Sequence, residues 1–111
     1  MAGSIQILKI DTHAITSGVG KANNLSSFIV EGTFTYTGFG NRVYVRCICI
    51  QPNGTPEAFD SGPWALGVNQ PWNCTCAPTN FMNSIPLSAH LLGDDMVTAL
   101  ADPAGGVRVT L

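Results

Sequence analysis

The feature that most constrains the fold of this chain is an alternation of apolar and polar side chains with a period of two. It is clearest in the segment Phe28–Tyr36, where aromatic and aliphatic residues take every second position except position 32. Because successive side chains of a strand point to opposite faces, this pattern predicts a half-buried β-strand. Gly32 interrupts the apolar face, which predicts a bulge or the close approach of a bulky neighbour.

A second alternating segment, Arg42–Ile50, follows a glycine-rich turn. Apolar residues occupy both of its faces, which predicts a central strand that is covered on both sides. Weaker patterns predict further strands at 5–10, 57–60, 70–76, 96–101 and 106–111, the last two forming a closing hairpin. The segment Pro86–Leu92 is followed by Gly93 and is predicted to form a single helical turn.

These segments amount to about seven short strands separated by turns rich in glycine, proline and asparagine. With 12 Gly and 7 Pro in 111 residues, a helical fold is disfavoured. We therefore expect one all-β domain over residues 1–111, an antiparallel two-sheet β-sandwich. By fold analogy it is immunoglobulin/fibronectin-like.

Charged residues make up only 11% of the chain, against about 25% in an ordinary soluble domain. Low charge favours a protein that packs against copies or partners. The net charge of −2 includes no run of basic residues, so a nucleic-acid partner is not expected. No apolar stretch is long enough for a membrane span, and no signal peptide is visible. We expect cytoplasmic synthesis and a final location in a virion or outside the cell.

The four cysteines form two Cys-x-Cys pairs, Cys47 with Cys49 and Cys74 with Cys76. If the two segments are neighbouring antiparallel strands, opposite residues are close enough for two disulfides, Cys47–Cys76 and Cys49–Cys74. Two alternatives stay open. One is a zinc site made by all four thiolates, and the other is four reduced thiols that serve as small core residues.

Aromatic residues in or next to the predicted loops, namely Phe39, Phe59 and Trp64, are candidates for a binding platform. The two histidines, His13 and His90, have no accompanying nucleophile motif. We therefore expect neither enzymatic activity nor a cofactor, with zinc as a lesser alternative.

The expected function is that of a structural or assembly protein, such as a virion component (capsid-decoration or tail-associated). Its expected partners are other protein subunits, which include further copies of this chain. An extracellular adhesion or carbohydrate-binding module is the first alternative, and a small Cys₄ metal-binding protein is the second.

Overall fold

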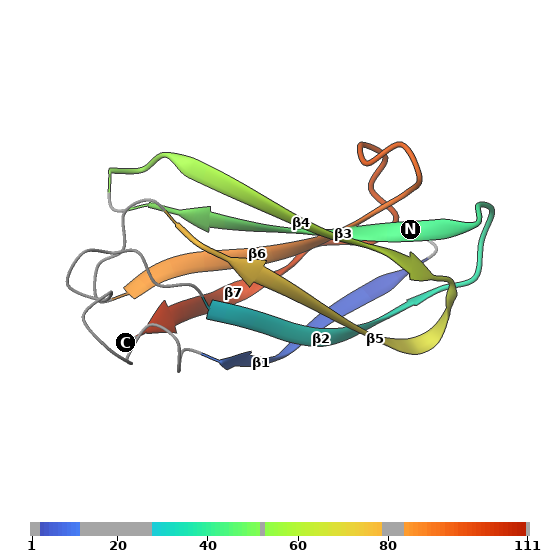
Figure 1. The fold of residues 1–111 in the computed structure, drawn as a ribbon, viewed down its shortest axis with the longest axis horizontal. Helices are drawn as coiled ribbons and strands as arrows, with labels where there is room; N and C mark the ends of the chain where they lie inside the picture. The colour runs from blue at the N-terminus through green and yellow to red at the C-terminus, as the bar shows by residue number, and fades with distance from the viewer. Residues whose placement is uncertain (1–2, 12–27, 52, 79–83, 111) are drawn as a thin grey trace.

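The computed structural model describes residues 3–11, 28–51, 53–78 and 84–110. Within these ranges the chain forms strands and turns and no helix (Figure 1). The strands are β1 (Ser4–Asp11), β2 (Phe28–Tyr36), β3 (Arg42–Ile50), β4 (Pro56–Ala65), β5 (Gly67–Cys76), β6 (Ser84–Leu92) and β7 (Ala104–Thr110). The described part of the chain therefore has no helix that could span a membrane.

The strands form two antiparallel sheets that pack face to face. One sheet has three strands in the order β1-β2-β5, and the other has four in the order β4-β3-β6-β7. Figure 1 shows the two sheets as the layers of an elongated sandwich-like molecule. The prediction of an all-β chain with two antiparallel sheets is confirmed.

The two alternating segments fold as predicted, with strands at Phe28–Tyr36 and Arg42–Ile50. Strand β3 is central in its sheet because it pairs with β4 on one side and β6 on the other. Its inward face is fully buried, whereas its outward face is only partly buried. The predicted cover of both faces is therefore complete on the inward face and partial on the outward one.

Two predictions at the C-terminal side are wrong. The predicted helical turn Pro86–Leu92 lies within strand β6, which is hydrogen-bonded to β3 on one side and to β7 on the other. The predicted strand at 96–101 is instead a turn followed by an isolated bridge between Leu92 and Ala99. The side chain of Asp95 accepts hydrogen bonds from the backbone N–H groups of Val97 and Thr98, and these bonds favour the turn over a strand.

The core lies between the sheets and is built from inward side chains of every strand except β4, whose Phe59 and Trp64 pack against it while partly buried. Trp72, Phe28 and Phe34 are its largest fully buried members. Gly32 faces Trp72 closely, since a Cβ atom at position 32 would lie 2.8 Å from Cζ2 of that indole. The predicted close approach of a bulky neighbour at Gly32 is confirmed.

Three connections meet at one end of the sandwich, which we call the loop end. They are the turn 37–41 between β2 and β3, the turn at Leu66 between β4 and β5, and the loop 93–103 between β6 and β7. In Figure 1 they lie toward the right-hand end of the molecule. The backbone N–H of Asn69 donates to Thr35 Oγ1 and fixes the start of β5 against the end of β2.

Candidate functional site

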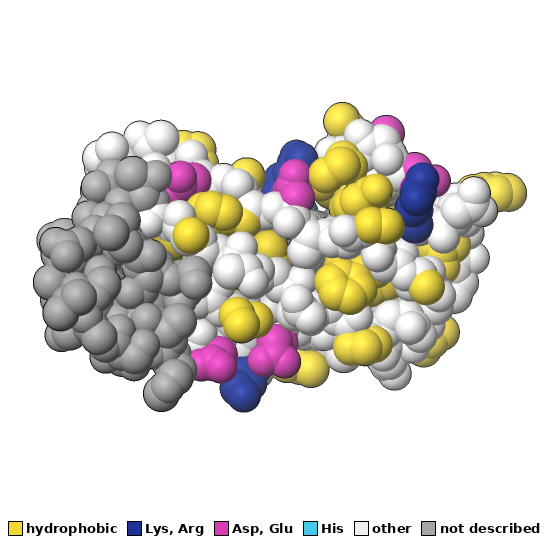
Figure 2. Space-filling view, viewed as in Figure 1, with side chains coloured by type: hydrophobic (Ala, Val, Ile, Leu, Met, Phe, Trp, Pro, Cys, Tyr) yellow, Lys and Arg dark blue, Asp and Glu magenta, His cyan; other side chains and the backbone are white. Residues whose placement is uncertain are grey.

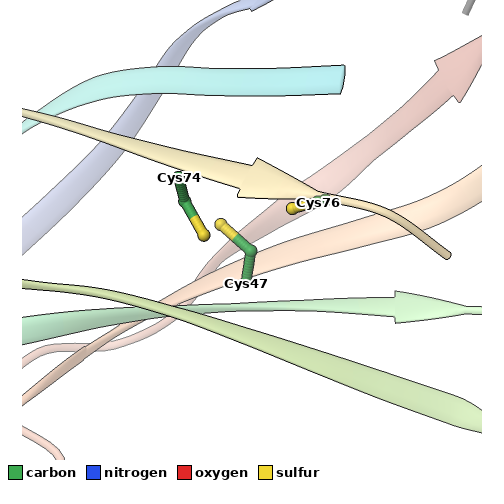
Figure 3. Close-up of side chains that lie close together, drawn as sticks. All are labelled: Cys47, Cys74 and Cys76. Atoms are coloured by element: carbon green, nitrogen blue, oxygen red, sulfur yellow. The ribbon is translucent and has the colours of Figure 1, made fainter. Parts of the chain in front are cut away.

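The four cysteines meet in the interior of the sandwich. Cys47 and Cys49 point inward from β3, Cys74 and Cys76 point inward from β5, and all four are buried free thiols. The Sγ atoms of Cys47, Cys74 and Cys76 lie within 4.8 Å of one another. Figure 3 shows the side chains of Cys47 and Cys74 pointing toward each other across the gap between the sheets. The structure thus brings together the cysteines that the sequence singled out.

The expected relation between the two Cys-x-Cys segments is wrong. They are not neighbours in one sheet, because β3 pairs with β4 and β6 whereas β5 pairs with β2. Nor do they run in opposite directions. Since β4 is antiparallel to β3 and the chain reverses again before β5, β3 and β5 both run away from the loop end. Any bond between these cysteines must therefore join the two sheets.

The thiols form a connected cluster. Cys47, Cys74 and Cys76 interact with one another, and Cys76 also interacts with Cys49. Hydrogen bonds from the Cys47 and Cys76 thiols stabilise a thiolate at Cys74, which lowers the pKa of Cys74. The hydrogen bond to Cys74 raises the pKa of Cys47, and hydrogen bonds with Cys47, Cys49 and Cys74 raise that of Cys76; burial adds to both increases. One thiolate can therefore be held among protonated neighbours, and the site can do thiol chemistry or bind a soft metal.

A second candidate site is the set of exposed apolar side chains at the loop end. We use the name loop-end patch for three such residues on separate connections of this end, Phe39, Val68 and Val97, of which Phe39 is 99% exposed and Val97 78% exposed. Figure 2 shows hydrophobic side chains at the surface over this end of the molecule, interspersed with Lys or Arg and Asp or Glu side chains. Apolar groups at the surface mark a contact site where they are large and fully solvent-facing, and Phe39 is the clearest case here.

The loops that carry the loop-end patch are held in place by hydrogen bonds. The Tyr36 hydroxyl donates to the carbonyl oxygen of Phe39 at 3.1 Å. An ion pair between Arg42 Nε and Asp94 Oδ1, at 3.2 Å, joins the start of β3 to the β6–β7 loop. Phe39 is therefore presented to solvent by a fixed backbone.

The other two aromatic candidates are less available. Phe59 and Trp64 are partly buried against the core, and the indole N–H of Trp64 donates to Ser61 Oγ at 3.3 Å. Of the three aromatic residues that the sequence proposed for a binding platform, only Phe39 has a fully solvent-exposed side chain. The three do not share one surface patch.

Trp64 does line a groove together with Trp72. Leu8, Lys9, Glu31 and Asn73 are among the other residues of its walls. Trp72 Nε1 is buried and has no hydrogen-bond partner within the described ranges. The groove thus combines two indoles with ionic and amide side chains.

The described chain contains one close pair of a hydroxyl and a histidine. Ser88 Oγ lies 2.9 Å from His90 Nε2 on the outer face of β6. Burial lowers the pKa of His90, and the nearby Arg46 lowers it further. Since Arg46 is a cation, it does not stabilise the protonated form of this base as the carboxylate of a catalytic triad does. His13 lies outside the described residues.

Sequence reasoning missed Val68 and Val97 because aliphatic residues are ordinarily expected in the core. The signal that was present is positional: each lies within a few residues of a turn or loop that the fold brings to the same end. Comparisons with protein-family models, with curated proteins and with solved structures found no match.

Proposed function

We propose that this chain is a non-enzymatic structural or assembly protein that acts through protein–protein contacts, for example as a capsid-decoration or tail-associated component of a virion. The observation that carries the proposal is the loop-end patch, where Phe39 is 99% exposed. Burying a phenylalanine side chain contributes about 1.5–3 kcal/mol. A chain that holds one in water on a hydrogen-bonded turn gains that free energy when a partner covers it.

The charge distribution supports a partner made of protein, and in the first instance a second copy of this chain. With a net charge of −2, copies repel one another only weakly. Of the charged groups next to the patch, Arg42 and Asp94 already form an ion pair, so burial at an interface would leave neither of them as a single unpaired charge. The third, Asp95, accepts hydrogen bonds from Val97 and Thr98.

Within this proposal the sandwich is of the immunoglobulin or fibronectin type. The connectivity supports this assignment, because the chain passes from β1 and β2 to β3 and β4 in the other sheet, returns for β5, and crosses again to β6 and β7. In such sandwiches the loops at one end are a common binding surface. A location in a virion or outside the cell is part of the same proposal.

Sedimentation velocity over a range of protein concentrations tests the assembly function. We expect the sedimentation coefficient of the wild-type chain to rise with concentration, and Phe39→Ser to weaken self-association by roughly tenfold or more, as the loss of a central interface aromatic does. Leu8→Ser is the matched control, because Leu8 is 65% exposed but lies on β1 away from the loop end. A wild-type chain that stays monomeric at every concentration would overturn the proposal.

A specific observation favours one second candidate, the carbohydrate-binding or adhesion module. The groove is lined by the partly exposed indole of Trp64, with Lys9, Glu31 and Asn73 as polar neighbours, whereas Trp72 belongs to the core. Sugar rings stack on aromatic faces and hydrogen-bond to such polar side chains. This candidate predicts a change in tryptophan fluorescence with members of a glycan panel, which Trp64→Leu should abolish. No response across the panel would reject it.

A further inference from the structure

The contacts among the four cysteines fix an order along the interior of the sandwich. The sulfur atom of Cys47 on β3 lies within 4.8 Å of both sulfur atoms of β5, which are equally close to each other, and the neighbour of Cys49 is Cys76. Because β3 and β5 run in the same direction, the sulfur atoms alternate between the sheets in the order Cys74, Cys47, Cys76, Cys49. Cys74 and Cys49 are then the two ends of the row.

We propose that the mature protein carries two parallel disulfides that join its sheets, Cys47–Cys74 and Cys49–Cys76. This is the one pairing of neighbours in the row that uses all four sulfur atoms. The pairing expected for adjacent antiparallel strands, Cys47–Cys76 with Cys49–Cys74, would require the two ends of the row to bond past the sulfur atoms that lie between them.

The local spacing of the sheets fits such bonds. Stacked sheets are ordinarily about 10 Å apart, and a disulfide needs Cα atoms roughly 4.4–6.8 Å apart. Strands β3 and β5 approach more closely than ordinary stacked sheets, since some of their residue pairs have Cα atoms within 8 Å. The sulfur atoms themselves meet across the gap, with those of Cys47 and Cys74 within 4.8 Å of each other. The thiol of Cys74 also reaches the Phe59 carbonyl oxygen of β4, at 3.3 Å.

Each bond forms by thiol–disulfide exchange with a small-molecule disulfide such as oxidised glutathione. A cysteine thiolate attacks the oxidant and releases one glutathione thiolate, and the partner cysteine, after losing its proton, displaces the second. Each bridge therefore consumes one oxidised glutathione, yields two reduced ones and removes two hydrogens from the protein. Because all four sulfur atoms are buried in the folded chain, we place the exchange during folding.

Oxidative refolding of the denatured, reduced protein in a glutathione buffer tests the inference, with zinc chloride present in a parallel sample. The expected product has an unfolded mass four hydrogens lower than that of the reduced chain, and it binds no metal. A native mass with one zinc and four reduced thiols would overturn the inference in favour of a metal site. Four reduced thiols without zinc would overturn it as well.

Two matched double variants test the pairing. Cys47→Ala with Cys74→Ala leaves Cys49 and Cys76, which are neighbours in the row and should form one bridge. Cys47→Ala with Cys76→Ala leaves Cys49 and Cys74, the two ends of the row, which should stay reduced. Far-UV circular dichroism checks that both variants fold. A bridge in the second variant and none in the first would show that the order is wrong.

If the first variant does not fold, Cys49→Ala with Cys76→Ala replaces it and should form the Cys47–Cys74 bridge. The side chains of Cys47 and Cys74 are the two that point toward each other in Figure 3. This inference is independent of the proposed assembly function, because the loop-end patch contains none of the cysteines.

Discussion

Single residues decide how the interior of this sandwich is filled. Near Gly32 the interior must hold the indole of Trp72, and it gains the space because position 32 has no side chain. At the cysteines the inward side chains are small, and sulfur atoms from the two sheets lie within 4.8 Å of each other. Packing at near-crystalline density leaves little room for change at either place.

The first prediction concerns Gly32→Ala. A Cβ atom at this position would lie 1.9 Å from the carbonyl oxygen of Gln6 and 2.8 Å from Cζ2 of Trp72, so the backbone of β1 must move. We expect the free energy of unfolding, measured by urea denaturation, to fall by about 1–3 kcal/mol. Gly105→Ala is the control, because a Cβ there has no neighbour within 4 Å. An equal effect in both variants would contradict this explanation of Gly32.

The second prediction concerns Asp95. Hydrogen bonds from Thr98, through its hydroxyl and its N–H, and from the N–H of Val97 lower the pKa of this carboxylate to about 2. The bonds favour the charged form, so the stability that they give the loop is present above the ordinary pKa of 3.8 and is lost as the pH falls toward 2. We expect the Thr98 amide resonance to shift with a midpoint near pH 2.

Asp94, the neighbouring carboxylate, provides the internal comparison. It accepts its hydrogen bond from Arg42 rather than from the backbone of the loop. Asp95→Asn should abolish the shift of the Thr98 amide, and Asp94→Asn should preserve it. A titration midpoint near pH 4 for the Thr98 amide in the wild-type chain would mean that the three hydrogen bonds do not lower the pKa of Asp95.

At the scale of strands, an element could be predicted where its own residue pattern was sufficient, and could not where its structure depended on pairing with distant strands. Strands β2 and β3 could be predicted because β-branched and aromatic residues recur in each with a period of two, and the buried side chains follow that period. Strand β6 could not, because its Leu, Ala and His residues also suit a helix and its hydrogen bonds come from β3 and β7, which are distant in sequence. Tertiary pairing overrode the local preference.

The cysteine site shows the same limit. The i, i+2 spacing correctly indicates that Cys47 and Cys49 share one face of a strand, as do Cys74 and Cys76. Which strands become neighbours depends on the connectivity of the whole chain. A local pattern therefore predicts the participants of the site but not their order.

The third prediction belongs to strand β6. His90 pairs in register with Arg46 of β3, and its ring contacts Ser88. Burial, together with the positive charge of Arg46, lowers the pKa of His90 below 6.5. The unfolded state therefore takes up a proton more readily, so the free energy of unfolding should decrease as the pH falls from 7 through the folded-state pKa.

Denaturant titrations at several pH values measure this effect. His90→Gln removes the titrating group and should flatten the dependence between pH 7 and 5, whereas His13→Gln should leave the His90 contribution in place. Asp60 is relevant as well, because it binds Arg46 through Nε at 2.6 Å and through a second nitrogen. Asp60→Asn would leave the Arg46 charge less compensated and should lower the His90 pKa further. An unchanged slope in His90→Gln would contradict the assignment.

At the scale of the whole molecule, the two sheets are separate β-ladders, and side-chain packing, the connecting segments and a few hydrogen bonds, such as that from Cys74 to the Phe59 carbonyl oxygen, hold them together. If the inferred bridges form, covalent bonds join the sheets within the core. The loop end lies beyond the bridged region, since β3 and β5 both begin there and reach their cysteines only later. The loops that carry Phe39 and Val97 can therefore vary without disturbing the bridges.

The last prediction follows from this arrangement. A Cys47–Cys74 bridge closes a loop of about thirty residues, which on the chain-entropy estimate stabilises the fold by about 3–4 kcal/mol. The second bridge adds less, because the first already holds the same segments together in the unfolded state. Reductant should therefore lower the free energy of unfolding by about 4 kcal/mol in total. It should also steepen the dependence on denaturant, since an unfolded chain without bridges exposes more surface. A variant with alanine at all four cysteines should not respond, and a wild-type chain with the same denaturation curve with and without reductant would mean that no bridges are present.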